Sequence, residues 1–296
     1  MPRRRGWASG FLSRDLSATA DRRKPHADLG KGAVDLKYRV RIVDRIPVKL
    51  DPAEVLGLAE FRRLRDREGE VRRLLQASST LMRPRGVFTL LAVESISNGT
   101  VHLEGGHVLN SIVLADAARP GRRVAPYVIT IGPELEDEAS RMSQTDIFGG
   151  WLLARIGDYA LGKASLYVRS LIEGELGKSP SSFSPGTGTG RLFGIEQQKV
   201  LFDILAPQNS IGVTLTLGYV MVPFKSISGV FAAADGEYVA CRYCPGGCRY
   251  RKAEYSGEYL AVKRGGEECD GSVQSDCLAP VGGEHTLADA TEGRRD

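Results

Sequence analysis

Cysteine is scarce in this 296-residue chain, and all five cysteines lie beyond residue 240. A disulfide scaffold requires cysteines distributed along the whole domain. Their placement excludes such a scaffold and indicates one local site near the C-terminus. Histidine is also rare. The four histidines are scattered, and no two have the His-x3-His spacing of a helical metal site.

Long apolar runs are also missing. No segment approaches the roughly 20 consecutive apolar residues that a membrane-spanning helix needs. The N-terminus carries Arg3, Arg4 and Arg5 but lacks the apolar segment of a secretory signal. We therefore expect a soluble, cytoplasmic protein without a membrane partner.

Positive charge is concentrated at the start of the chain. Residues 1–40 hold ten Lys or Arg and four Asp or Glu, so a net charge of +4 leaves the remainder at −2. The remainder has no stripe of basic residues with interleaved aromatics, which argues against nucleic-acid binding. We divide the chain into a flexible basic leader (1–35), one globular domain (36–255) and a disordered tail (256–296).

Within the domain, segments with the apolar spacing of strands alternate irregularly with segments that have the spacing of helices. Strands are expected at 38–43, at 87–96 and 101–103 around Asn98-Gly99, and at 124–131, 211–217 and 226–233. Helices are expected from Asp51 to about residue 75, from 133, over 148–176 as one helix or two broken at a glycine, and over 195–205. This grouping predicts an α+β fold, with an antiparallel or mixed sheet and long packed helices.

A Ser-, Gly- and Pro-rich segment follows the long helix. The run Ser181-Ser182-Phe183-Ser184-Pro185-Gly186-Thr187-Gly188-Thr189-Gly190-Arg191 lets backbone N–H groups approach a polar ligand closely. It is not a phosphate-binding loop of the Walker type, because no Gly-Lys-Ser/Thr closes it. A flexible linker is the alternative interpretation.

The order of the segments around this loop favours a ligand-binding loop over a flexible linker. After Ser184-Pro185-Gly186 come a helix with Gln197, Gln198, Lys199 and Phe202, then Ile211-Gly212-Val213-Thr214-Leu215-Thr216, Met221-Val222-Pro223 and Ser226-Ile227-Ser228-Gly229. This series resembles the reactivation domain of cobalamin-dependent methionine synthase. Over about residues 36 to 255 the chain is similar to free-standing relatives of that domain.

The resemblance implies a ligand, S-adenosylmethionine (AdoMet), and a partner that carries cobalamin. By motif position it assigns Ser184, Pro185, Gly186 and Thr187 to the ligand loop. Ser182 and Thr187 stand where the family has Arg and Tyr, and Leu217-Gly218 where it has an acid and a Ser. Because Ser cannot replace the paired donors of a guanidinium, Arg191 is our candidate for the ligand carboxylate.

The cysteines form the second candidate site. Pro245-Gly246-Gly247 lies between Cys244 and Cys248, and Cys241 precedes Cys244 by three positions. Three thiolates at this spacing can converge on a soft metal. Cys269 or Cys277 could complete a zinc site or an iron–sulfur cluster. Reduced cysteines without metal are the other possibility. The free-standing relatives carry a similar cysteine cluster.

We assign no catalytic side chain, because no nucleophile lies in a recognisable pairing with a base. The resemblance implies an accessory protein that reactivates a corrinoid-dependent methyltransferase of the methionine synthase type and caps its corrinoid. The alternatives are an iron–sulfur electron-transfer protein and a zinc-stiffened interaction module, each acting on a corrinoid protein.

Overall fold

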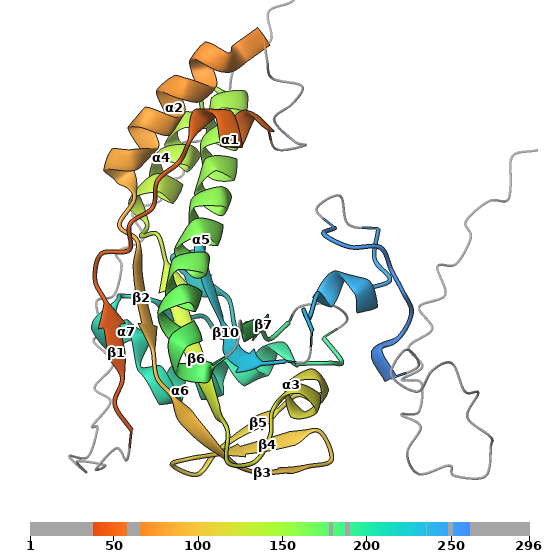
Figure 1. Ribbon diagram of the computed structural model, residues 1–296. Coiled ribbons are helices and arrows are strands. Elements are labelled where there is room, and N and C mark those ends of the chain that lie inside the picture. Colours follow the sequence, from red (N-terminus) through yellow and green to blue (C-terminus); the bar gives the residue numbers. More distant parts are fainter. Residues whose placement is uncertain are drawn as a thin grey trace, which may run out of the picture. The chain divides into compact units, whose positions relative to one another are not determined.

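The computed structural model describes residues 38–57, 66–177, 180–186, 190–234, 236–247 and 251–260, which all belong to the unit Leu36–Asp296 (Figure 1). Its elements in chain order are β1 (Arg41–Val43), α1 (Pro52–Gly57), α2 (Glu68–Leu81), β2 (Arg85–Phe88), β3 (Leu91–Ser97), β4 (Thr100–Leu103), β5 (His107–Asn110), α3 (Ile112–Ala117), β6 (Arg123–Thr130), α4 (Glu134–Met142), α5 (Ile147–Leu176), β7 (Pro180–Phe183), η2 (Ile195–Gln197), α6 (Gln198–Leu205), α7 (Pro207–Ser210), β8 (Thr214–Leu215), β9 (Met221–Val222), β10 (Ser226–Ala233) and η3 (Ala240–Tyr243).

Strand β6 is the centre of an eight-stranded sheet. It pairs with β10 along one edge and with β2 and β3 along the other. Strand β7 pairs with the far edge of β10, and β4 and β5 extend the sheet beyond β3. Each of these pairings is antiparallel, so the predicted combination of helices with an antiparallel sheet is confirmed. Strands β8 and β9 form a separate hairpin.

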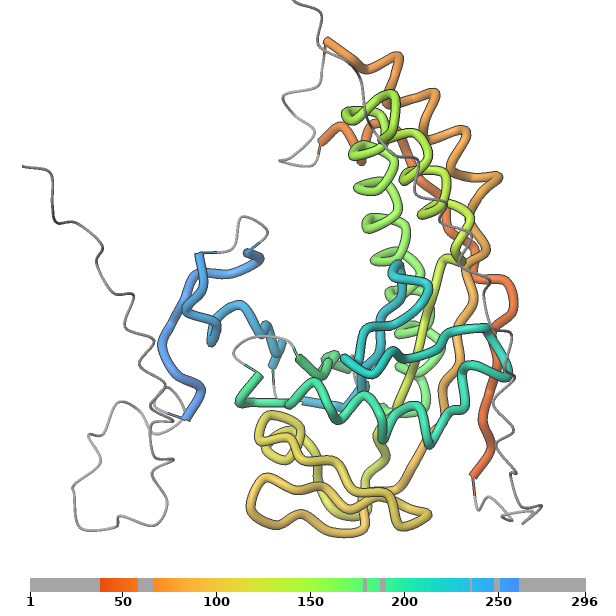
Figure 2. Tube along the Cα trace, turned by 180° about the vertical axis from the view of Figure 1, so that it is seen from behind, coloured from red at the N-terminus to blue at the C-terminus, as the bar shows by residue number. Residues whose placement is uncertain are grey.

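The two faces of β6 bury different side chains. Val124 and Val128 face α6 and the β3–β5 meander, whereas Tyr127 and Ile129 face α5. Every residue of β6 except Arg123 is buried. A strand buried on both faces needs an apolar run without alternation, which is what residues 124–131 provide. Figure 2, from behind, shows the α6 and α7 segment over the face opposite α5.

Helix α5 is unbroken over 30 residues. The Asp146 side chain accepts a hydrogen bond from the N–H of Gly149 at its start, and Gly177 ends it with a φ of 74°. Ala164, Val168 and Ile172 pack on the sheet, while the first half of the helix packs against α2 and α4. In the described part of the chain, no helix is both long and apolar enough to cross a membrane.

Three expectations about local structure differ from what is found. The helix expected to end near residue 75 continues in α2 to Leu81, and residues 58–65 of its expected length lie outside the described ranges. The strand expected over 211–217 shortens to β8, because Ile211 caps the end of α7 and Gly212 has a φ of 74°. The segment after α5 includes a short strand, β7, rather than loop alone. At Asn98-Gly99 the predicted turn is confirmed, with both φ angles positive.

Candidate functional site

The candidate loop starts at β7, where strands β6, β7 and β10 lie close together. The phenol oxygen of Tyr127 in β6 lies 2.7 Å from the hydroxyl oxygen of Ser182. Burial raises the pKa of Tyr127, and its hydrogen bonds with Ser182 and Ser184 oppose this only in part. The phenol therefore stays neutral at pH 7. Ser182, which stands where the resembling family has an Arg, forms this hydrogen bond with a sheet tyrosine.

Gly229 in β10 makes this approach possible. A Cβ at this position would lie 2.7 Å from the carbonyl oxygen of Phe183, 2.8 Å from Ser184 Oγ and 3.0 Å from the Tyr127 hydroxyl. Any side chain would push β7 away from β10. Gly229, the last residue of the Ser-x-Ser-Gly motif, thus contacts the first residues of the Ser-Pro-Gly loop.

The loop then turns sharply at Gly186. Its φ is 77°, and its N–H donates to the carbonyl of Phe193 at 2.8 Å. Pro185 is buried, whereas Gly186 is exposed. Of the remaining predicted ligand residues, Thr187 lies outside the described residues. Arg191 is exposed, and its side chain has no hydrogen bond or ion pair with any described residue.

Gln198 joins two further motif segments. Its amide nitrogen donates to the carbonyl of Tyr219 at 3.2 Å, and its amide oxygen accepts from Ser228 Oγ at 3.2 Å. Gln198 is itself buried. Residues separated in the sequence by up to 30 positions are therefore connected through one side chain, which ties α6 to the β8–β9 hairpin and to β10.

The hairpin formed by β8 and β9 carries an exposed apolar surface. We name Leu217, Val220, Val222 and Phe224 the hairpin patch. Leu217 is fully exposed, and Phe224 is 65% exposed. Large apolar side chains gathered on a projecting turn are costly in water and typical of contact surfaces. The sequence did not identify these residues as a contact surface, because two-residue strands are too short to show a periodic pattern.

Polar contacts fix the base of this hairpin. Glu136 in α4 accepts hydrogen bonds from the N–H groups of Phe224 and Lys225, at 2.9 and 3.4 Å. The Lys225 ammonium is buried and lies 2.5 Å from Asp158 of α5. Glu136, in the first turn of α4, therefore positions the hairpin. Neither Lys225 nor Asp158 was expected at the site, since ion pairs 67 positions apart leave no local signal.

The cysteine turn is held by an arginine. Arg251 donates to the carbonyls of Cys241 and Cys244, both at 2.6 Å, and to that of Gly246. Cys241 and Cys244 are free and partly buried. Cys248, Cys269 and Cys277 lie outside the described residues. Among the described residues, no three His, Cys, Asp or Glu side chains converge as metal ligands, and the metal site stays a prediction.

An aromatic cluster packs the cysteine turn against β7. Phe183 and Tyr238 stack with their ring centres 4.7 Å apart, and the Tyr259 hydroxyl donates to Asp116 at 2.6 Å. Burial, and then the hydrogen bond with Asp116, raises the pKa of Tyr259. Burial likewise raises the pKa of Tyr238. The residues after β10 are thus anchored next to the candidate loop.

Similarity to known proteins is limited to solved structures. No protein-family model matches the sequence, and no curated protein matches it. Among solved structures, the chain is similar to one described as the crystal structure of the MetH reactivation domain bound to AdoHcy, with a TM-score of 0.54 and 14% sequence identity. The match covers 68% of this chain and 80% of that one. The chain therefore shares the fold of a methionine synthase reactivation domain.

Proposed function

We propose that this protein is an accessory factor that docks on a corrinoid-dependent methyltransferase of the methionine synthase type and assists the return of its cobalamin to the methylated state. The observation that carries the proposal is the assembly of the resembling motifs. Ser184, Gln198, Tyr219, Ser228 and Gly229 come together through direct contacts, on a fold related to a reactivation domain.

In this role the chain contributes binding and shielding. AdoMet would supply the methyl group and the partner's corrinoid the reacting metal, as is usual where a cofactor carries the difficult chemistry. Ser184, Pro185, Gly186 and Thr187 would hold the ligand chiefly through backbone groups. A neutral Tyr127 behind Ser182 and Ser184 keeps the floor of the loop uncharged.

The hairpin patch would form the contact with the partner. Its apolar side chains would exclude water from the covered corrinoid, and the bonds from Glu136 and the ion pair of Lys225 with Asp158 would keep it oriented. A surface preorganised in this way loses less conformational entropy on binding.

The test uses a purified methyltransferase of this type loaded with cob(II)alamin, together with a chemical one-electron reductant. Adding the full chain and AdoMet is expected to change the visible spectrum of the corrinoid and to increase the rate of recovery of the methylated form. Replacing AdoMet by AdoHcy, which has no methyl group to donate, should retain complex formation but abolish recovery. An unchanged spectrum and an unchanged rate would refute the proposed function.

A further inference from the structure

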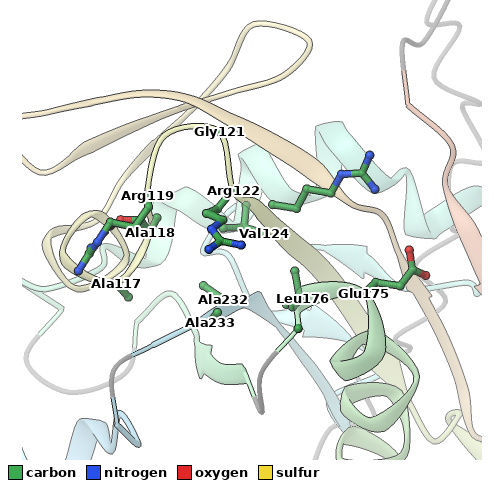
Figure 3. Close-up of a pocket in the computed structure, with 12 residues that line it drawn as sticks. Ala117, Ala118, Arg119, Gly121, Arg122, Val124, Glu175, Leu176, Ala232 and Ala233 are labelled. Carbon is green, nitrogen blue, oxygen red and sulfur yellow. Dashed lines mark hydrogen bonds between the residues drawn. The ribbon is translucent and has the colours of Figure 1, made fainter.

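A cavity, which we name the Arg122 cavity, lies between the C-terminal end of α5 and the turn between α3 and β6 (Figure 3). Its volume is about 560 Å³. Its apolar walls are supplied by Ala117, Ala118, Val124, Leu176, Ala232 and Ala233, and its rim by Arg119, Arg122, Arg123 and Glu175. Small side chains on the floor and long cationic ones on the rim leave room for a ligand of moderate size.

The charges around this cavity do not cancel. Glu175 is the one carboxylate among the lining residues, and it pairs with Arg41. The side chains of Arg122 and Arg123 form no hydrogen bond or ion pair with any described residue. The C-terminal end of α5 opposes them with only about half a negative charge. The field in the cavity is therefore positive.

The backbone holds Arg122 in place. The N–H of Gly121 donates to the carbonyl of Val93, and the N–H of Val93 donates back to the carbonyl of Arg122, each at 2.8 Å. Gly121 has a φ of 76°, which closes the turn after Pro120. Figure 3 shows the Arg122 guanidinium projecting over Ala232 and Ala233. The backbone of Arg122 is thus fixed at the edge of the cavity, from which its guanidinium can reach an anion inside.

The Arg122 cavity lies next to a cavity with aromatic walls, which we name the aromatic cavity. Ala117 and Arg119 line both the Arg122 cavity and the aromatic cavity of about 280 Å³, which includes Phe183, Tyr238, Tyr243 and Tyr259. Stacked rings such as those of Phe183 and Tyr238 offer a flat apolar wall. A ligand that spans the shared boundary would place a ring at one end and a negative group at the other.

We propose that the Arg122 cavity is an anion-binding subsite, and that together with the aromatic cavity it takes a small molecule carrying a heteroaromatic ring and a carboxylate or phosphate. Arg122 binds the anion through charge-assisted hydrogen bonds. The subsite was not among the residues expected from the sequence, and it needs neither a corrinoid partner nor methyl transfer. Failure of the reactivation assay would leave it untouched.

Isothermal titration calorimetry on the full chain tests this inference, with adenosine monophosphate, AdoHcy, adenosine and inorganic phosphate as probes. At least one of the two ring-bearing anions should bind more tightly than adenosine and than phosphate alone. Tighter binding of adenosine monophosphate identifies a phosphate ligand, and tighter binding of AdoHcy identifies a carboxylate ligand. Substituting Arg122→Gln should weaken that binding roughly 10- to 100-fold and leave adenosine binding unchanged.

The matched control is Arg73→Gln, which removes the same charge from an exposed position on α2. It should bind the probes like the unmodified chain. Equal affinities of the Arg122 and Arg73 variants would overturn the inference. Binding of neither anion more tightly than adenosine would also overturn it.

Discussion

At the scale of single residues, Gly229 determines how closely β7 and the candidate loop can approach β10. The carbonyl of Phe183 and the hydroxyls of Ser184 and Tyr127 occupy the space that a side chain would need. A backbone carbonyl cannot move aside as the end of a flexible side chain can. The glycine is therefore a packing requirement, independent of any ligand.

Substituting Gly229→Ala is expected to lower the free energy of unfolding by about 1–3 kcal/mol, because the added methyl group must displace β7. Urea denaturation followed by circular dichroism measures the change. Gly162→Ala is the control, since a Cβ there meets nothing within 4 Å inside helix α5. It should raise stability by about 0.5–1 kcal/mol. Equal effects of the two substitutions would contradict the packing argument.

Residue identity predicted part of this arrangement. Asn98-Gly99 was expected at a tight turn, and both residues adopt positive φ angles. The contact between Ser182 and Tyr127 could not be predicted, because it joins residues 55 positions apart through a strand not expected from the sequence. The roles of Gln198 and Lys225 were hidden for the same reason, since side-chain pairing across elements leaves no periodic pattern.

At the scale of elements, the segment after β10 is fixed to the domain by tyrosines. Tyr238 stacks on Phe183, and the Tyr259 hydroxyl donates a hydrogen bond to Asp116 in α3. Because burial raises the pKa of both tyrosines, the folded protein keeps them protonated above pH 10, where tyrosines in the unfolded chain ionise. The unfolded state then binds fewer protons, so stability is retained below about pH 10 and falls as the pH rises further.

Tyr259→Phe should reduce this alkaline loss. At pH 8 the variant is expected to be about 1 kcal/mol less stable, because the hydrogen bond with Asp116 is missing. Between pH 10 and 11 its free energy of unfolding should fall less steeply than that of the unmodified protein. Urea titrations at each pH measure both effects, with Tyr255→Phe, at an exposed position, as control. Parallel pH curves for all three proteins would show that Tyr259 is not responsible.

Elements with strong patterns were predicted well, and short ones were not. The buried run of β6 and the helical segment of α5 follow from apolar spacing, and both are found, with α5 as one helix. Strand β7 has four residues and begins with Pro180, so propensity favours a loop there. It becomes a strand because β10 offers an unpaired edge, which is a property of the assembled sheet.

At the scale of the whole molecule, the candidate loop and the hairpin patch depend on one support. Strand β10 contacts β7 through Gly229 and α6 through Ser228, and it follows directly on the hairpin base at Lys225. The order of motifs along the sequence suggested a common site. Their joining through β10 could be learned only from the fold, because no motif specifies its own neighbour.

Leu217→Asp tests whether the hairpin patch is the docking surface of the proposed complex. The side chain of Leu217 is fully exposed, so the unfolding free energy should change by no more than about 0.5 kcal/mol. Burying Leu217 against a partner would contribute about 1.5–3 kcal/mol, and an aspartate there must also lose its hydration. Binding to the corrinoid methyltransferase, measured by surface plasmon resonance, should therefore weaken at least about tenfold. Leu166→Asp, at an exposed position on α5, should bind normally. If both variants bind like the unmodified protein, the partner contacts another surface, because a single buried charge at the centre of an apolar contact cannot be neutral.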